Sequence, residues 1–277
     1  MSEKVVAITG ASNGMGLEAA KLFAQRGWIV YGGARRVEKI PTTNGIHALK
    51  LDVTDDASRE AFIQTILTDQ HRIDVLINNA GYGEYGPLEE LPLENLKAQF
   101  DVNFFGAAAL TQLVLPTMRA QHSGRIVNIS SIGEDVFTPL GGAYHATKAA
   151  LRRWSNVLDQ EVKGFGIRSV IVQPGGTQSS WAEIAMANAK KNLKPNSVYR
   201  PLVEAVETQL SGIPASAATS ADLARLFYRA ATDETPKYAY FNTWSDRLMA
   251  RTARVHPRLY MRIADRLMKG FSKEAAK

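Results

Sequence analysis

Short hydrophobic runs rich in β-branched residues alternate along the chain with longer segments in which hydrophobic residues recur every three or four positions. The first kind of segment predicts strands, and the second predicts amphipathic helices. Seven strands are predicted in this way, at residues 5–9, 28–32, 46–51, 73–77, 125–130, 167–172 and 238–241. Regular alternation of strand and helix is typical of a parallel sheet that carries helices on both faces.

Several of these strands are hydrophobic at most positions instead of alternating, as at residues 5–9, 75–78 and 126–130. That pattern is typical of strands covered on both sides. No internal repeat and no linker rich in Gly, Ser or Pro divides the chain, so we expect one doubly wound α/β domain over residues 1–277. A polar, helix-prone insert at about 177–213 follows the sixth predicted strand, where open sheets bind ligands, and predicts a substrate lid.

The composition narrows the class of protein. With 277 residues, 45% of them hydrophobic and 22% charged, the chain can bury a sizeable core and is close to the average of soluble globular domains. The absence of cysteine excludes disulfides, a thiol nucleophile and cysteine metal sites. No segment approaches the roughly 18 consecutive hydrophobic residues of a membrane span, and no signal-peptide pattern is seen, so we expect a cytoplasmic protein. The five histidines are scattered, and no metal site is expected.

A glycine-rich turn follows the first predicted strand. Gly10, Gly14 and Gly16 stand at the junction with the next helix, where backbone N–H groups and a helix N-terminus can approach a pyrophosphate. The spacing is Gly-x3-Gly-x-Gly, which differs from the Gly-x-Gly-x-x-Gly of the general dinucleotide fingerprint. Tight packing of strand on helix without a ligand is the alternative explanation.

Two further motifs follow in order, Asn78-Asn79-Ala80-Gly81 after the fourth predicted strand and Tyr144-x3-Lys148. With the glycine turn, they resemble the short-chain dehydrogenase/reductase family over about residues 4–241. The resemblance implies a seven-stranded Rossmann-type sheet and a nicotinamide cofactor. Carried over by position, it implies cofactor contacts at Gly10, Ser12, Asn13, Gly14, Met15, Gly16, Asp52, Val53, Asn79, Ala80 and Gly81.

Charge at the end of the second predicted strand distinguishes the two nicotinamide cofactors. An acidic residue there would bind the adenosine ribose hydroxyls and repel a 2′-phosphate. The chain has Ala34 at that place, followed by Arg35, whose guanidinium can form charge-assisted hydrogen bonds with a phosphate. We therefore expect NADP(H) rather than NAD(H). The alternative is that Arg35 and Arg36 are solvated loop charges, and Asn13 adds no second basic group.

Tyr144 and Lys148 are four residues apart, a spacing that brings two side chains onto one helix face within about 6 Å. A phenol titrates near 10, so acid–base work near neutral pH requires a group that stabilises phenolate, and an ammonium does so. The resemblance implies that Tyr144 is the acid/base and that Lys148 also contacts the nicotinamide ribose. The neighbouring His145 points about 100° away on the helix, and we interpret it as packing.

Ser130 and Ser131 end the fifth predicted strand, and because strand residues alternate in direction only one can readily point into the site. The family pattern selects Ser131, thirteen residues before the tyrosine, to hydrogen-bond the substrate oxygen. A small bulge would exchange the two serines. Asn103 matches the family's asparagine that holds a water beside the lysine. Read alone, it would be a helix cap or a kink.

The stretch after the sixth predicted strand resembles the family's carboxamide-binding segment. It implies further cofactor contacts at Pro174, Gly175, Thr177 and Ser179, with Thr177 and Ser179 both candidates for the hydroxyl. The family often has threonine in place of Ser179.

The motifs imply an NADP(H)-dependent oxidoreductase that transfers hydride between nicotinamide and a carbonyl or alcohol. The alternative is a non-catalytic NADP(H)-sensing regulator on the same fold, which need not retain the acid–base pair. Enoyl reduction is disfavoured, because relatives with that chemistry usually space the tyrosine and lysine more widely. We expect an apolar small-molecule substrate, because the predicted lid carries several large side chains that are mostly apolar. They are Trp181, Ile184, Met186, Leu193 and Tyr199.

Basic residues concentrate at the C-terminal end. From residue 237 onward ten basic residues stand against three acidic ones, so the net charge of +6 belongs to this tail. The extension at about 243–273 predicts a basic amphipathic helix that starts at Pro257, with Arg254, Arg258, Arg262 and Arg266 every four residues. Such a helix packs on its own domain or a second subunit, or lies on anionic lipid. We favour packing.

Other macromolecular partners are judged from motifs and small-residue segments. No nucleic-acid motif accompanies the basic charge, so no nucleic acid is expected. Residues 107–115 and 149–158 offer small and hydrophobic side chains that could pair across a two-fold axis, as in relatives. We expect a homodimer or homotetramer.

Overall fold

A seven-stranded parallel sheet forms the centre of the computed structural model, which describes residues 3–178, 181–212 and 217–272. The spatial order is β3-β2-β1-β4-β5-β6-β9, and every neighbouring pair is parallel. The strands are β1 (Val5–Thr9), β2 (Ile29–Ala34), β3 (Ile46–Lys50), β4 (Val75–Asn78), β5 (Gly124–Ile129), β6 (Ile167–Gln173) and β9 (Ala239–Phe241). The predicted fold class is confirmed.

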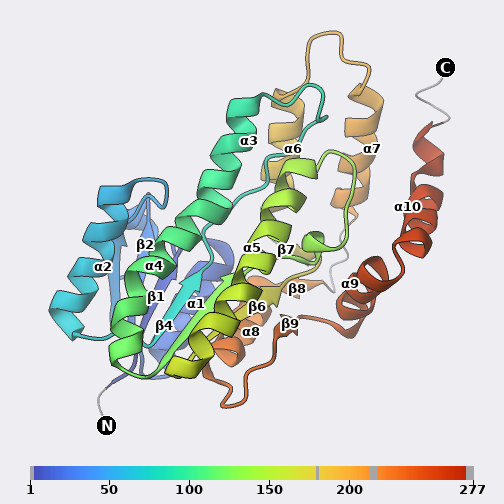
Figure 1. Ribbon diagram of the computed structural model, residues 1–277. Coiled ribbons are helices and arrows are strands. Elements are labelled where there is room, and N and C mark those ends of the chain that lie inside the picture. Colours follow the sequence, from blue (N-terminus) through green and yellow to red (C-terminus); the bar gives the residue numbers. More distant parts are fainter. Residues whose placement is uncertain (1–2, 179–180, 213–216, 273–277) are drawn as a thin grey trace.

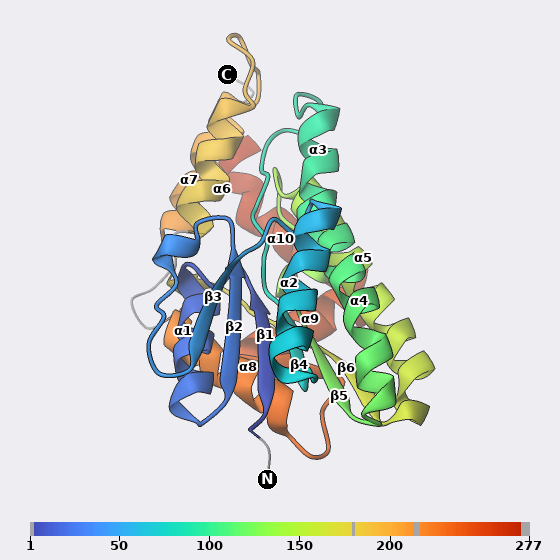
Figure 2. The same ribbon diagram turned by 90° about the vertical axis from the view of Figure 1, so that its left-hand side faces the viewer.

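Each face of the sheet has its own hydrophobic core. Val6 and Ile8 of β1 pack in one core, whereas Val5 and Ala7 pack in the other, because successive strand residues point to opposite faces. Figure 2 shows the helices on the two sides. On one side lie α1 (Gly14–Gln25) and α8 (Ser220–Thr232), and on the other α2 (Asp56–Gln70), α4 (Gly106–Ala120) and α5 (Gly142–Val162). Burial on both sides explains why these strands are hydrophobic throughout.

A group of helices rises beyond the sheet. They are α3 (Leu93–Phe100), α6 (Trp181–Lys191) and α7 (Arg200–Ser211) (Figure 1). The last two occupy the insert for which a substrate lid was predicted, and we call this segment the lid. The lid is attached through a small parallel sheet that the sequence did not predict, in which β7 (Thr177–Gln178) pairs with β8 (Ala218–Thr219). Short turns of 3₁₀ helix occur at Val37–Lys39, Ile132–Glu134 and Lys163–Phe165.

The C-terminal extension forms two helices, α9 (Trp244–Val255) and α10 (Pro257–Ser272), at the side of the domain (Figure 1). The start at Pro257 is confirmed. The prediction that Arg254 continues the repeat of this helix is wrong, because the backbone leaves the helical conformation at His256, with φ −127° and ψ 61°. None of the helices in the described part of the chain combines the length and the apolar character that crossing a bilayer requires.

Two contacts attach the extension to the turn after β5. The Tyr260 hydroxyl accepts the N–H of Phe137 at 3.1 Å and donates to the carbonyl of Phe137 at 2.7 Å. Arg254 of α9 forms an ion pair with Asp135 at 2.5 Å. One face of each helix therefore packs on its own domain, as favoured.

We expect Tyr260→Phe to lower the free energy of unfolding by about 1–2 kcal/mol. The loss of the hydroxyl leaves the polar backbone groups of Phe137 without their partner. Urea denaturation of the two proteins measures the difference. Tyr228→Phe is the matched control, because the Tyr228 hydroxyl makes no hydrogen bond within the described residues. Equal losses in both variants would contradict the prediction.

Candidate active site

The glycine turn brings β1, α1 and the segment after β4 into close contact. Gly10 has φ +70°, a conformation that favours glycine, and a Cβ on Gly16 would lie 2.5 Å from the Gly10 carbonyl oxygen. The Thr9 hydroxyl accepts the N–H groups of Asn79 and Ala80 at 3.0 and 2.9 Å. The Asn79 side chain donates to the Thr9 carbonyl at 2.9 Å. The two predicted motifs therefore form one structural unit.

A cavity of about 580 Å³ opens at the carboxyl ends of the strands, beside this turn. The predicted cofactor residues that line it are Gly10, Ser12, Asn13, Gly14, Met15, Arg35, Asp52, Val53, Asn79, Ala80 and Gly81. Gly16 lies beneath the turn and is not among the lining residues. Further lining residues were not predicted as cofactor contacts, namely Ala34, Arg36, Leu51, Thr54, Tyr82, Ala98, Asp101, Val102, Trp181 and Ile184. They come from several strands and helices, and no local motif identifies them.

The cavity has the donors and acceptors that a dinucleotide requires. Asn79 Oδ1 is buried and has no hydrogen-bond partner within the described residues, so it is left to accept from a ligand. The N-terminus of α1 begins at Gly14, directly beside the cavity, and offers N–H groups to an anion. These features fit a bound nicotinamide dinucleotide.

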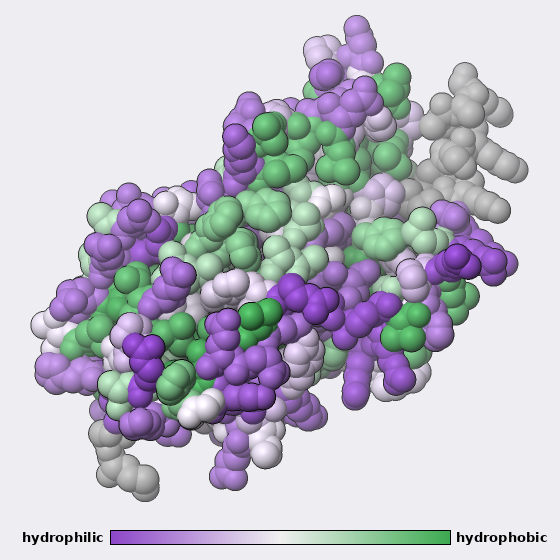
Figure 3. All heavy atoms as spheres, viewed as in Figure 1, coloured by the Kyte–Doolittle hydropathy of each residue, from purple (hydrophilic) through white to green (hydrophobic). Residues whose placement is uncertain are grey.

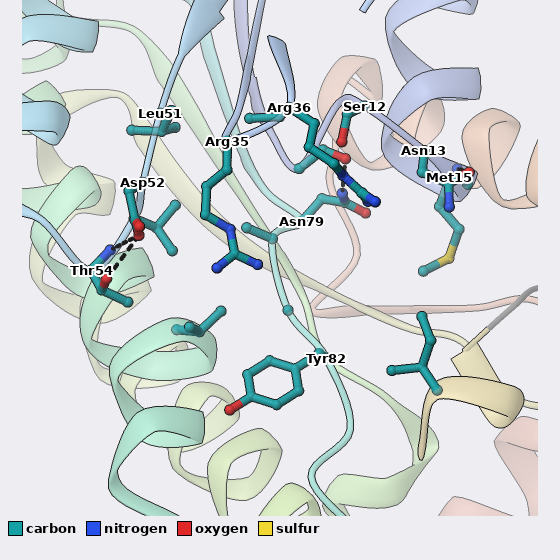
Figure 4. A pocket seen from close by; sticks show the side chains of 18 of the residues that line it. Ser12, Asn13, Met15, Arg35, Arg36, Leu51, Asp52, Thr54, Asn79 and Tyr82 are labelled. Atoms are coloured by element: carbon teal, nitrogen blue, oxygen red, sulfur yellow. Dashed lines mark hydrogen bonds between the residues drawn. The ribbon is translucent and has the colours of Figure 1, made fainter. Parts of the chain in front are cut away.

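Two arginines lie at the cavity wall directly after β2, at the position that the sequence predicts for contact with a 2′-phosphate. Ala34 is the last residue of β2, and Arg35 and Arg36 follow it at the cavity wall. Figure 4 shows the Arg35 side chain reaching into the pocket between Asp52 and Tyr82. The pKa of the Asp52 carboxyl is lowered, first by the Thr54 N–H that it accepts at 3.0 Å and also by the charge of Arg35. Arg35 is therefore a pocket residue as well as a loop charge.

Tyr144 and Lys148 lie on the same face of α5, as predicted from their spacing. The Lys148 ammonium is 5.7 Å from the centroid of the Tyr144 ring, and both residues are buried. The ammonium donates to the carbonyl of Ile129 at 2.8 Å. A Cβ on Gly81 would lie 3.5 Å from the same ammonium, so the pair adjoins the end of the cavity.

Asn103 lies in a π-helical turn (Asp101–Phe105) between α3 and α4. Such turns are rare and occur frequently at functional sites. The Asn103 side chain donates to the Tyr82 carbonyl at 3.0 Å and to the Thr147 hydroxyl at 3.2 Å, and it accepts the Tyr82 N–H at 3.1 Å. It therefore connects the cavity wall to the helix that carries Tyr144 and Lys148.

The two serines have different surroundings. Ser130 is buried and donates to the carbonyl of Lys148 at 3.3 Å, a structural contact. The Ser131 hydroxyl is hydrogen-bonded to Tyr144, and it also accepts the N–H of Gly133 at 3.0 Å. Of the two candidates, the structure brings Ser131 to the tyrosine.

The pKa of Tyr144 differs from the expectation of an acidified phenol. Burial raises this pKa above its usual range, although the hydrogen bond from Ser131 lowers it. Burial also lowers the pKa of Lys148 to about 8. The physical reason is that the ring lies in a hydrophobic cluster with Tyr85 and Met186, while the ammonium donates to Ile129. The local spacing of two residues does not reveal this desolvation.

Aromatic residues cover the phenol. The ring of Trp181, the first residue of α6, lies 4.9 Å from the Tyr144 ring, and the ring of Tyr85 lies 6.2 Å from it. His145 uses both ring nitrogens within the loop, toward the Gly133 carbonyl at 2.8 Å and the Thr138 N–H at 3.1 Å. The lid therefore contacts the tyrosine directly, and His145 packs as interpreted.

The predicted carboxamide segment is only partly described. Pro174 accepts the N–H of Ile132 through its carbonyl at 2.9 Å, and Gly175 packs against the Asp246 carboxylate of α9. Thr177 lies in β7 and lines a second cavity of about 550 Å³ between α6 and α7. Pro174, Gly175 and Thr177 are not among the residues that line the first cavity, and Ser179 lies outside the described residues.

Within residues 3–178, 181–212 and 217–272, no three His, Asp or Glu side chains gather as a metal site would require.

Glu134, a residue that the sequence analysis did not identify, has a buried carboxyl group near Tyr144 and Lys148. Its Oε1 forms an ion pair with Arg152 Nε at 3.0 Å and accepts a hydrogen bond from the Gln173 side-chain amide. Burial raises its pKa from 4.5 to about 8, against the opposing effect of Arg152. The folded protein therefore retains a proton here that the unfolded chain releases above about pH 4.5.

The raised pKa of Glu134 implies that its contribution to stability is present at low pH and is lost as pH rises from about 4.5 to about 8. We expect Glu134→Gln to flatten the pH dependence of unfolding in this range, by up to about 1.4 kcal/mol per pH unit. Urea denaturation at a series of pH values measures the slope. Glu60→Gln, on the exposed side of α2, is the control and should leave the slope unchanged. An unchanged slope in Glu134→Gln would contradict the assignment.

A dinucleotide-sized cavity on a parallel sheet, beside a buried tyrosine and lysine, defines a nucleotide-binding oxidoreductase of the Rossmann type. The family model for short chain dehydrogenases matches residues 4–190. The chain belongs to the short-chain dehydrogenase/reductase family. It is 36% identical to the probable short-chain type dehydrogenase/reductase VdlC of Helicobacter pylori, over 79% of this chain and 80% of that one. It is 39% identical to a 3-ketodihydrosphingosine reductase of Bacteroides thetaiotaomicron, over 66% of this chain and 67% of that one.

Solved structures agree with the fold along almost the whole chain. A short-chain dehydrogenase from Streptomyces avermitilis has a TM-score of 0.81 and 30% identity, covering 98% of both chains. Two others share the fold at 22% identity. One is a serine dehydrogenase complexed with NADP+, with a TM-score of 0.74, covering 86% of this chain and 93% of that one. The other is a short-chain dehydrogenase/reductase from Burkholderia phymatum in complex with NAD, with a TM-score of 0.78, covering 93% of this chain and 95% of that one. Neighbours in fold thus bind either nicotinamide dinucleotide.

Proposed function

We propose that this oxidoreductase uses NADP(H) to interconvert an apolar ketone or aldehyde and its alcohol, with Tyr144 as the acid/base. The observation that carries the proposal is the cluster of Tyr144, Lys148, Ser131 and Asn103. These four residues do not line the cavity themselves, but they adjoin its lining residues Gly81, Tyr82 and Trp181. The cofactor, when bound, supplies or accepts a hydride at nicotinamide C4.

In the direction of reduction, the Tyr144 hydroxyl donates its proton to the carbonyl oxygen of the substrate. Ser131, already hydrogen-bonded to the phenol, donates to the same oxygen and shares the charge that develops on it. The Lys148 ammonium stabilises the phenolate that remains and contacts the nicotinamide ribose. Asn103 holds a water beside Lys148, since its Oδ1 and the ammonium both face Gly81.

Recognition of NADP(H) depends on Arg35 at the position after Ala34. Its guanidinium is a donor for the 2′-phosphate, and Ala34 removes the acidic residue that would repel that phosphate. Arg36 and Ser12 also line this end of the cavity and would contribute further donors. Pro174, Gly175, Thr177 and Ser179 stay proposed contacts of the carboxamide.

The substrate class follows from the lining of the lid. Trp181, Met186 and Leu193 pack in the same hydrophobic cluster as Tyr144, so a substrate that reaches the phenol meets apolar side chains. Tyr199 does not belong to this set, because its hydroxyl donates to Glu89 at the surface at 2.5 Å. The relative named as a 3-ketodihydrosphingosine reductase is consistent with reduction of a keto group.

We also propose a homodimer or homotetramer through α4 and α5, since members of the family often oligomerise. Figure 3 shows hydrophobic residues gathered on the face over these helices. Phe105, Val157 and Phe165 are exposed large hydrophobic residues in this part of the chain. Light scattering on the purified protein measures the oligomeric state.

The test of the proposed function is consumption of NADPH with a panel of aliphatic and aromatic ketones and aldehydes. We expect turnover with NADPH, a lower kcat/KM with NADH, and a preference for apolar over small charged carbonyls. A protein that binds NADPH but turns over no member of the panel would favour the non-catalytic sensor. Activity confined to small charged carbonyls would contradict the substrate class.

A further inference from the structure

Helices α9 and α10 bury one face each and leave the other open. Ala250, Ala253 and Tyr260 are buried against the domain, and Arg254 and Tyr260 attach to the turn after β5. Figure 1 shows both helices at the edge of the molecule, with α9 beside β9 and α10 farther out. Among the residues that the structure describes, the side chains of these helices do not belong to the two hydrophobic cores of the sheet.

The outward face of α9 carries large hydrophobic side chains. Trp244 is 76% exposed, Leu248 46% and Val255 55%. At 100° per residue these three positions fall within about 40° of one another, and the buried Ala253 lies opposite them. Sixteen large hydrophobic residues are exposed in the described part of the chain, and seven of them belong to α9 and α10, namely Trp244, Leu248, Met249, Val255, Leu259, Met261 and Ile263.

Arginines flank this hydrophobic stripe. Arg247 and Arg251 of α9 are exposed, and within the described residues neither forms an ion pair. Arg258 and Arg262 of α10 are in the same situation, whereas Arg254 is paired with Asp135. Figure 3 shows hydrophilic and hydrophobic residues side by side over α9. We call Trp244, Arg247, Leu248, Arg251 and Val255 the α9 surface.

We propose that the α9 surface docks on the headgroup region of an anionic phospholipid bilayer. An interfacial helix needs an apolar face with an aromatic residue, flanked by basic side chains, and the α9 surface has both. Each arginine near an anionic leaflet adds electrostatic attraction. The residues before 237 carry almost no net charge, so the positive charge of the protein lies in its C-terminal part. The charge thus orients the molecule with its C-terminal helices toward the lipid.

A second copy of the chain fits this surface less well. A two-fold contact places the same patch of both subunits face to face. Because the α9 surface contains Arg247 and Arg251 and no carboxylate, two positively charged patches would then face each other. The acidic residues within α9 and the described part of α10 are Asp246, which packs on Gly175, and Asp265. The charge pattern therefore favours an anionic lipid over self-association.

The test is binding of the full-length protein to vesicles, followed by sedimentation and by tryptophan fluorescence. Trp28 is buried, and Trp154 and Trp181 are partly buried, so an environment change at Trp244 dominates any spectral shift on binding. We expect binding to vesicles of phosphatidylglycerol and phosphatidylcholine but not to pure phosphatidylcholine. Binding should weaken as salt is raised, and the emission should shift to the blue.

Variants assign the binding to the α9 surface. We expect the double variant Arg247→Gln/Arg251→Gln to lower the association constant about thirtyfold, and Trp244→Ala about tenfold. Arg153→Gln/Arg229→Gln removes the same charge from exposed positions on α5 and α8, and Leu93→Ala removes an exposed leucine from α3. These controls should bind within about threefold of the parent, and circular dichroism checks that every variant is folded.

Several outcomes would overturn the proposal. They are absence of binding to anionic vesicles at low salt, equal losses in the α9 variants and the controls, or binding without a shift that depends on Trp244. A change of oligomeric state in Trp244→Ala, measured by light scattering, would assign the surface to a second copy instead. None of these measurements requires turnover, so they stand apart from the test of the proposed function.

Discussion

Tyr144→Phe is expected to lower kcat by about 10²–10⁴ while binding of NADPH is retained. The variant ring has no hydroxyl to donate to the substrate oxygen, and a positioned acid or base accounts for about this range of rate. The packing should survive, because phenylalanine keeps the ring that lies 4.9 Å from the Trp181 ring and 6.2 Å from the Tyr85 ring. Stopped-flow measurement of NADPH oxidation, with binding of NADPH followed by its fluorescence, tests the prediction.

Tyr85→Phe is the matched control for this experiment. Tyr85 lies 6.2 Å from Tyr144, and its hydroxyl bonds to Thr138 of the neighbouring loop. Because Thr138 engages this second hydroxyl, it lies outside the proposed group of Tyr144, Ser131 and Lys148. We expect Tyr85→Phe to keep kcat within a fewfold of the parent. Comparable losses in both variants would mean that the aromatic cluster, rather than the proton on Tyr144, limits the rate.

The fold could be predicted because its determinants are local. Strands such as β1 and β5 are covered on both faces, so each is a continuous hydrophobic run that stands out from the amphipathic helices around it. The two-residue strands β7 and β8 have no such pattern, since a run of two residues carries no period. They were therefore missed, although they attach the lid to the domain.

The same distinction applies to the site. Tyr144 and Lys148 are neighbours within one helix, so their spacing alone predicted that they share a face. The raised pKa of Tyr144 comes from Tyr85 and the lid helix, which are distant in sequence. Sequence spacing could predict the proximity of the pair but not its desolvation.

Long-range partners account for the remaining differences. Arg254 was predicted as one member of a basic repeat with a period of four residues, but it pairs with Asp135, 119 residues earlier. Glu134 gave no signal in the sequence, because its burial depends on Arg152 and Gln173. Asn103 was recognised by family position, whereas its π-helical turn is visible only in three dimensions.

Arg35→Gln is expected to raise the Kd for NADPH by about 10–10² and to leave that for NADH nearly unchanged. In the proposed role of Arg35, the substitution removes charge-assisted hydrogen bonds to the 2′-phosphate, and such bonds contribute about 1.5–3 kcal/mol. Arg35→Asp should have the larger effect, because a carboxylate at this place repels the phosphate. Arg35→Asp should therefore reverse the preference between the two cofactors. Titration of each variant with both cofactors, followed by fluorescence, measures the ratio.

Arg26→Gln provides the matched control for charge, since Arg26 caps the other end of α1 and does not line the cavity. It should change neither Kd, which separates a direct contact with the phosphate from a general loss of positive charge. Equal weakening of NADPH and NADH by Arg35→Gln would mean that Arg35 supports the pocket through Asp52 and Tyr82 instead. In that case the absence of an acid at Ala34 would allow the phosphate without selecting it, and the enzyme would use either nicotinamide dinucleotide.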